Sequence, residues 1–170
     1  MNMIDAVKSV LSQYFGFSGR ARRSEYWFWY LATILVAIVI AIIEALLGIS
    51  SEGSGPISLI FSLLIFFPTL AAAFRRLHDT GRSGWWIGGF YLGVIVFAII
   101  VGAMAVGAVA SGGDGDTTFM AGLGVFAIIG ALAILIYAIA LLIFLCQDSH
   151  PGPNKYGSNP KNQGNYDVFE

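Results

Sequence analysis

Four nearly uninterrupted apolar stretches, residues 26–47, 56–74, 85–110 and 119–146, dominate the pattern of the chain. Each matches or exceeds the roughly 20 residues that a helix needs to cross a bilayer. The stretches do not alternate with period two, as the strands of a membrane barrel would. A helix satisfies its own backbone groups within lipid. The pattern therefore predicts an all-α, polytopic membrane helical bundle with four transmembrane helices.

The polar ends of the chain frame this bundle. Before the first span, apolar residues recur every three or four positions, at Ile4, Val7, Leu11 and Tyr14. This spacing predicts a short amphipathic helix in the membrane interface, within a cytoplasmic segment 1–25. The first span is too long for the core of a signal peptide, so we expect it to be retained. Residues 147–170 form a turn-rich tail, and the whole chain is predicted to be a single integral membrane domain.

The charges are sorted by side, although their sum is only −1. All nine Lys and Arg residues precede the first span, lie between the second and third, or follow the fourth. The other two connections contain acids but no base, namely Glu52 in 48–55 and Asp114 and Asp116 in 111–118. Because cytoplasmic loops carry the excess of Lys and Arg, both termini are predicted to be cytoplasmic. Tryptophan and tyrosine at the start of the first and third spans favour the same side.

Two clusters on this side are candidates for binding. Residues 75–86 form a predicted hairpin that combines arginines with His78, Asp79 and two tryptophans, and residues 20–27 form a second basic cluster. Guanidinium groups bind phosphate in a bidentate manner, so an anionic lipid headgroup suits them. The alternative is an orientation signal with an aromatic belt. Beside a membrane span, attraction to anionic lipid explains the basic run better than nucleic acid does. Glu25 is predicted to pair with Arg75 or Arg82.

The polar segments carry a family resemblance. They read Gly-Phe-Ser-Gly-Arg-Ala-Arg-Arg-Ser-Glu-Tyr-Trp at 16–27, Arg-Arg-Leu-His-Asp-Thr-Gly-Arg-Ser-Gly-Trp-Trp at 75–86 and Pro-Gly-Pro-Asn-Lys-Tyr-Gly at 151–157. On these blocks the chain resembles the bacterial inner-membrane domain-of-unknown-function family eight-zero-five. The resemblance implies a small multi-pass protein of the bacterial inner (plasma) membrane without an assigned activity. It directs attention to the cytoplasmic blocks, because these polar segments carry the match.

The third block has two interpretations. It is either a rigid tail packed under the bundle or a lid that completes a headgroup site with Asn154, Lys155 and Tyr156. Glu44 is the one acid well inside an apolar stretch. Intramembrane acids are candidates for ion or proton sites. Here, however, we favour a side chain that reaches outward past Gly48 to the surface.

The function that the sequence favours is non-enzymatic, although it leaves an enzyme open. We expect an integral membrane protein whose cytoplasmic face binds anionic phospholipid headgroups or a protein partner. A homo-oligomer is a further possibility, and we expect no nucleic acid, metal or cofactor. The candidate residues are Arg20, Arg23, Arg75, Arg76, Arg82, His78, Asp79, Trp85, Trp86 and Asn154. The alternatives are a small oligomeric transporter or channel subunit using Glu44, and a membrane enzyme acting on a lipid-linked phosphate through His78 and Asp79.

Overall fold

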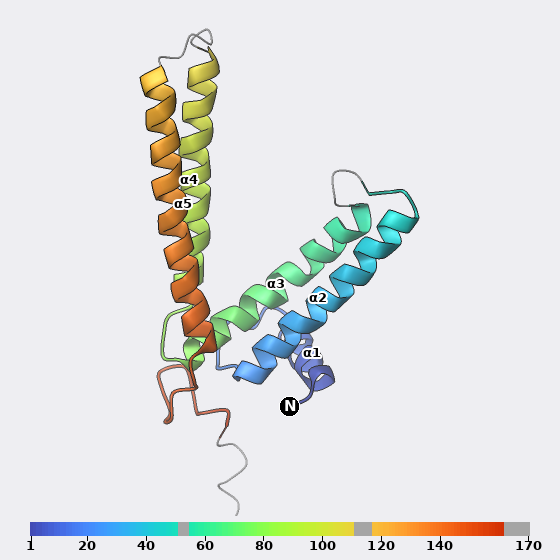
Figure 1. Ribbon diagram of the computed structural model, residues 1–170. Helices are drawn as coiled ribbons and strands as arrows, with labels where there is room; N and C mark the ends of the chain where they lie inside the picture. Colours follow the sequence, from blue (N-terminus) through green and yellow to red (C-terminus); the bar gives the residue numbers. More distant parts are fainter. Residues whose placement is uncertain (51–54, 111–116, 162–170) are drawn as a thin grey trace, which may run out of the picture. The chain divides into compact units, whose positions relative to one another are not determined.

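The computed structural model describes residues 1–50, 55–110 and 117–161. Its helices are α1 (Met3–Ser12), α2 (Arg23–Leu46), α3 (Pro56–Asp79), α4 (Trp85–Ala110) and α5 (Thr117–Cys146), drawn in Figure 1. Helices α2 to α5 are long and apolar enough to cross a membrane. The predicted all-α membrane fold with a short N-terminal helix is therefore confirmed. The predicted acids Glu52, Asp114 and Asp116 and the tail beyond 161 lie outside the described residues.

The chain divides into two compact units. The first comprises residues 1–84 and 145–170, and the second comprises residues 85–144. The first unit thus contains α1, α2, α3, the last two residues of α5 and the tail. The second contains α4 and most of α5.

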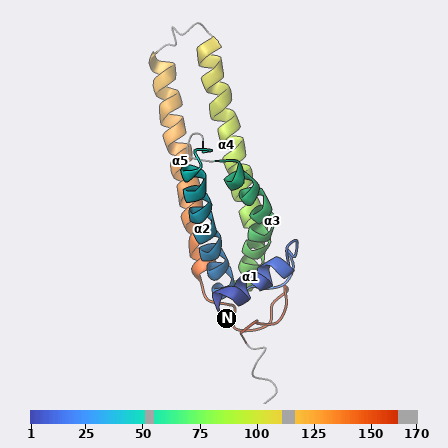
Figure 2. The ribbon, with the colours of Figure 1, turned by 90° about the vertical axis from the view of Figure 1, so that its right-hand side faces the viewer.

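In the first unit, α2 and α3 lie side by side and α1 packs against the beginning of α2 (Figures 1 and 2). Ala6 and Val10 of α1 are buried, as expected of the inner face of an amphipathic helix. The Asn2 side chain caps α1 by accepting a hydrogen bond from the Asp5 N–H at 2.8 Å. Within the pair, the Trp29 indole N–H donates to the Thr69 hydroxyl at 3.0 Å and joins α2 to α3.

Two helix ends extend by three residues or more beyond the apolar pattern. Helix α2 begins at Arg23 rather than at 26, and α3 continues to Asp79 rather than ending at 74. The apolar pattern marks the part of a helix that contacts lipid, whereas the helical backbone can continue into polar sequence. Cations in the last turn of α3 also complement the helix dipole. Thr80 is the C-cap of the helix, and Gly81 follows it with a positive φ of +79°, which favours glycine.

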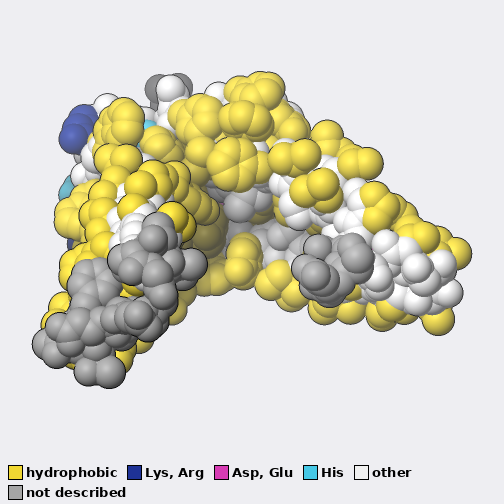
Figure 3. Space-filling model, turned by 90° about the horizontal axis from the view of Figure 1, so that it is seen from above, with side chains coloured by type: hydrophobic (Ala, Val, Ile, Leu, Met, Phe, Trp, Pro, Cys, Tyr) yellow, Lys and Arg dark blue, Asp and Glu magenta, His cyan; other side chains and the backbone are white. Residues whose placement is uncertain are grey.

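The second unit is a pair of adjacent helices (Figures 1 and 2). The Tyr137 hydroxyl donates to the Trp86 carbonyl at 2.9 Å, and the Phe97 and Phe126 rings lie 5.9 Å apart. Both helices are apolar all round, and many of their large hydrophobic side chains are exposed. Hydrophobic side chains also cover most of the described surface seen in Figure 3. Such helices are suited to lipid on their outer faces.

Candidate functional site: a buried arginine–aspartate network beside an open pocket

Asp79, the last residue of α3, is the centre of a buried charge network. Its Oδ1 accepts a hydrogen bond from Arg20 Nε at 2.9 Å, and its Oδ2 accepts one from Arg76 Nη1 at 2.5 Å. The side chains of Asp79 and Arg76 are fully buried, and that of Arg20 is 2% exposed. Ser149 Oγ donates a further bond to Oδ2 at 2.6 Å. One carboxylate therefore compensates two buried cations, which makes it the most sensitive charge of the network.

Backbone carbonyls satisfy the rest of both guanidinium groups. Arg20 donates from Nη1 to the Gly152 carbonyl and from Nη2 to the His150 carbonyl, each at 2.8 Å. Arg76 donates from Nε to the Leu145 carbonyl at 3.0 Å and from Nη2 to the Gln147 carbonyl. Arginine suits this position because its planar group carries five donors in a fixed geometry. The two arginines thereby tie the tail and the end of α5 to the end of α3.

His78 and Asn154 make further contacts between the end of α3 and the tail. The His78 ring stacks on the Tyr156 ring, with centroids 3.7 Å apart and planes 6° apart. Asn154 Nδ2 donates to the His78 carbonyl at 2.9 Å, and His78 Nδ1 lies 3.2 Å from the Gly19 carbonyl. The three polar blocks of the sequence therefore converge in space. These contacts agree with the interpretation of the tail as a rigid packed segment rather than as a lid over a headgroup site.

Arg75 joins α1 to the helix pair. Its side chain is buried, and Nη1 donates to the carbonyls of Gly16 at 2.6 Å and Gln13 at 3.2 Å. Its Nη2 lies 3.6 Å from Glu25 Oε1, which also accepts a hydrogen bond from Ser9 Oγ at 3.1 Å. The predicted pairing of Glu25 is thus confirmed with Arg75.

The remaining candidates are placed differently. Arg82 is half-buried, and its Nη1 donates to Gln147 Oε1 at 2.6 Å. Trp85 and Trp86 begin α4, in the second unit of the chain. Arg23 is the arginine with the clearest access to solvent among these candidates, because 46% of its side chain is exposed.

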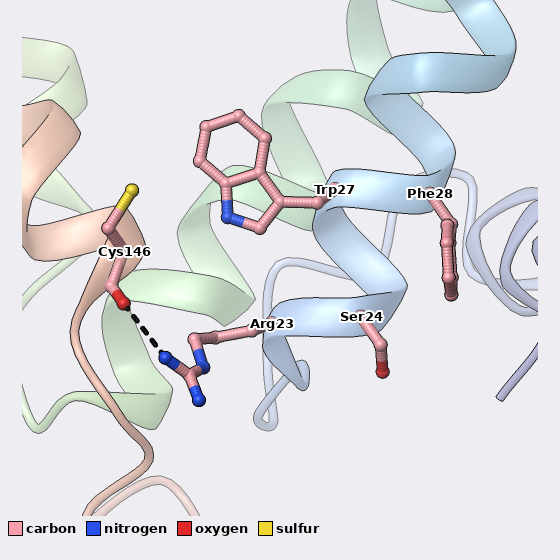
Figure 4. A pocket seen from close by; sticks show the side chains of 5 residues that line it. All are labelled: Arg23, Ser24, Trp27, Phe28 and Cys146. Atoms are coloured by element: carbon pink, nitrogen blue, oxygen red, sulfur yellow. Dashed lines mark hydrogen bonds between the residues drawn. The ribbon is translucent and has the colours of Figure 1, made fainter.

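Arg23 lies at an open pocket of about 450 Å³, which is lined by Arg23, Ser24, Trp27, Phe28 and Cys146 (Figure 4). Its Nη1 donates to the Cys146 carbonyl at 3.3 Å, the bond drawn as a dashed line. The pocket therefore combines one accessible cation with a mainly apolar lining. Ser24 and Trp27 fall within the basic cluster 20–27 that the sequence marked, whereas Phe28 and Cys146 fall outside both candidate clusters. Phe28 follows Ser24 by four residues in α2, and because residues four apart on a helix are neighbours, this spacing could have indicated it.

Asp148 contacts the same arginine from the tail. Its Oδ1 lies 3.6 Å from Arg23 Nη2 and also accepts a hydrogen bond from Lys161 Nζ. The bond from Lys161 lowers the pKa of Asp148 below its ordinary value, and a bond from the Ser149 N–H lowers it further. The carboxylate is 62% exposed, so solvent weakens both ion pairs.

Glu44 differs from our expectation. Its side chain is buried, and its carboxylate lies at the N-terminus of α3 instead of reaching outward. Oε1 accepts from the N–H groups of Ile57 at 2.6 Å and Ser58 at 2.9 Å, and Oε2 accepts from the Gly55 N–H at 3.1 Å and from the Ser58 hydroxyl. Our prediction that the Glu44 side chain reaches outward was wrong. The first N–H groups of a helix lack backbone partners, so a carboxylate at that position is stabilised.

Four apolar spanning helices with a polar network at the ends of α2 and α3 define a small multi-pass integral membrane protein. The chain belongs to the family described as "Protein of unknown function (DUF805)", whose model matches residues 14–158. It is 33% identical over 159 residues to the inner membrane protein YhaH of Escherichia coli (strain K12), covering 93% of this chain and 98% of that protein. It is 35% identical over 153 residues to the inner membrane protein YhaI of the same strain, covering 90% and 92%. No solved structure matches the chain significantly. The protein is therefore an integral inner-membrane protein.

Proposed function

We propose that the protein binds the headgroup of an anionic phospholipid at the pocket of Arg23, with this pocket and both termini facing the cytoplasm. The observation that carries the proposal is a partly exposed guanidinium group at the edge of an apolar pocket, at the start of a membrane-spanning helix. A phospholipid has the matching chemistry, since it joins a phosphate to apolar chains.

The contacts of Arg23 support this choice of residue. Its hydrogen bond to the Cys146 carbonyl is long at 3.3 Å, and its ion pair with Asp148 is 3.6 Å long and exposed. A phosphate forms shorter, charge-assisted hydrogen bonds with arginine and can therefore compete with both contacts. Ser24 offers a hydroxyl beside it. The rings of Trp27 and Phe28 suit the glycerol region and the first carbons of the chains, because aromatic rings favour that depth.

The buried arginines have a supporting role in this proposal. Arg20 and Arg76 bind the Asp79 carboxylate and backbone carbonyls within the protein. Arg75 is buried and donates through Nη1 to two carbonyls, while its Nη2 lies beside Glu25; its Nε and Nη2 have no hydrogen-bond partner in the described part of the chain. Arg20 and Arg76 hold the tail and the end of α5 at the end of α3. The cytoplasmic orientation is supported by the distribution of Lys and Arg along the sequence.

The test is lipid retention in native mass spectrometry of the whole protein, released from nanodiscs that contain phosphatidylglycerol and phosphatidylcholine. We expect one retained phosphatidylglycerol per chain in the natural protein. Arg23→Gln should reduce its affinity about tenfold or more, because a hydrogen bond to a charged group contributes about 1.5–3 kcal/mol. The same spectra report whether the protein is an oligomer.

Lys155→Gln is the matched control, since Lys155 is an exposed base of the tail outside the pocket. It removes the same charge and should leave phosphatidylglycerol bound. Equal retention by Arg23→Gln and the natural protein would refute the proposed site. Equal loss in both variants would point to general charge attraction instead of a pocket.

A further inference from the structure

Helix α3 contains a proline in its membrane-spanning part. Pro68 is buried within α3. It has no backbone N–H, so the carbonyl four residues earlier, that of Leu64, loses its helical donor. An unsatisfied carbonyl is unfavourable in lipid, and prolines in membrane helices are tolerated where neighbouring groups satisfy it.

The N-terminal segment supplies that neighbouring group. The Tyr14 hydroxyl donates a hydrogen bond to the Leu64 carbonyl, although 50 residues separate the two in sequence. Leu64 lies 15 residues before Asp79 at the end of α3, a distance of about 22 Å along a helix that rises 1.5 Å per residue. The segment after α1 therefore reaches along α3 well beyond its polar end.

Aromatic contacts continue this path. The Phe15 ring lies 5.2 Å from the Phe67 ring and 4.7 Å from the Tyr14 ring. Phe15 is nevertheless 65% exposed, and Phe67 is 44% exposed. The exposed apolar surface of the N-terminal segment is thus continuous with the outer surface of a membrane-spanning helix.

The two exposed flanks of α1 differ in chemistry. Ile4 and Leu11, seven residues apart and on one side, are 63% and 48% exposed. Asp5 and Ser12 lie on the other side and are also exposed. An amphipathic helix of this kind is stable where lipid meets one flank and water the other.

We propose that the N-terminal segment is inserted into the leaflet at the basic end of α2 and α3. Its Leu11 and Phe15 flank faces phospholipid acyl chains, and Tyr14 closes the proline break of α3. We assign lipid as the partner of this flank because the flank is continuous with the surface that α3 presents to lipid. The insertion is deepest at Tyr14 and Phe15 and shallowest at the start of α1. It does not depend on a headgroup in the Arg23 pocket.

The first test measures depth with spin labels in vesicles of phosphatidylethanolamine and phosphatidylglycerol. The native Cys146 is replaced by serine, and single labels are attached through Leu11→Cys, Phe15→Cys and the control Ser12→Cys. We expect collisions with oxygen relative to a water-soluble nickel chelate to increase from position 12 to 11 to 15. A label at 15 as accessible to the chelate as the label at 12 would overturn the insertion. Shielding of position 15 from both reagents would assign its flank to protein instead of lipid.

The second test is a double-mutant cycle that leaves the aromatic rings in place. Tyr14→Phe removes the hydroxyl and should lower the thermal unfolding midpoint of the full chain. In a Pro68→Ala background the restored backbone N–H can bond to the Leu64 carbonyl, so Tyr14→Phe should lose most of its effect. Equal decreases in both backgrounds would overturn the role of Tyr14 at the proline break. Arg23→Gln should leave the result of this cycle unchanged. The test of Tyr14 can therefore fail or succeed independently of the headgroup site at Arg23.

Discussion

The two ends of the α2–α3 pair both bury acids, but they do so with different partners. At one end, Asp79 binds Arg76 three residues earlier on its own helix, and also Arg20 and Ser149, which are 59 and 70 residues away in the sequence. At the other end, Glu44 binds backbone N–H groups and a hydroxyl only 11 to 14 residues away. The first is a network of charges and the second is a helix cap made by a single carboxylate.

The difference shows how a buried acid can serve tertiary or local structure. Asp79 compensates formal charges, so its loss would leave two cations buried. Glu44 faces partial charges at a helix N-terminus, where the loss of the anion weakens the cap but leaves no buried opposite charge. We therefore expect unequal effects when each acid is neutralised.

Asp79→Asn should have the largest effect on stability. The amide keeps the size of the side chain but removes the charge that compensates Arg20 and Arg76. We expect a decrease of about 3–5 kcal/mol in the free energy of unfolding, the usual result of removing one partner from a buried ion pair. Reversible unfolding of the purified protein in detergent micelles measures this change.

The control for this measurement is Asp148→Asn, which removes the same charge from an exposed aspartate. A surface ion pair contributes little, so its effect should be much smaller than that of Asp79→Asn. Equal effects of the two variants would show that the network around Asp79 does not stabilise the fold.

Glu44→Gln should have an intermediate effect. The substitution removes the negative charge and replaces one acceptor oxygen by an NH₂ group, which cannot accept hydrogen bonds from the N–H and hydroxyl donors around it. We expect a decrease of about 1–2 kcal/mol in the free energy of unfolding, typical of losing a helix cap. Gly55→Ala should act in the same direction, because a Cβ at Gly55 would collide with the Glu44 carboxylate.

Ser62→Ala is the matched control within α3, since the Ser62 hydroxyl donates to the Ser58 carbonyl of its own helix. It should change stability much less than Glu44→Gln. A neutral Glu44→Gln would contradict the capping role and return attention to an ion or proton site at Glu44.

The smallest expected effect is the loss of the Asp148 ion pairs at low pH. Because its pKa is lowered in the folded protein, its pairs with Lys161 and Arg23 are fully present above the ordinary aspartate value of 3.8. They are lost as the pH falls through the lower folded value. An environment-sensitive label on Cys146 should therefore report little change between about pH 8 and 5, and a transition only below the ordinary value. The same label in Asp148→Asn should lack this transition, and a transition at neutral pH would contradict the assignment.

The helices were predictable because membrane insertion depends on local apolar length. The polar ends of the helices were less predictable, because α3 continues to Asp79 through residues that the apolar pattern excludes. Part of the site was also accessible from sequence. The density of polar residues marked three blocks that contact one another in the structure, and opposite charges predicted that Glu25 pairs with Arg75 or Arg82, of which the structure shows Arg75.

By itself, the sequence determined four apolar spans, an amphipathic N-terminal helix and the sorting of bases to one set of loops. Only the tertiary structure decided which arginines are buried, because each of their carbonyl partners depends on how distant segments fold together. It also decided that Glu44 caps α3 and that Tyr14 meets the carbonyl left by Pro68. The physical reason is that hydrophobic length is a sum over neighbouring residues, whereas a hydrogen bond needs two particular atoms within about 3 Å of each other.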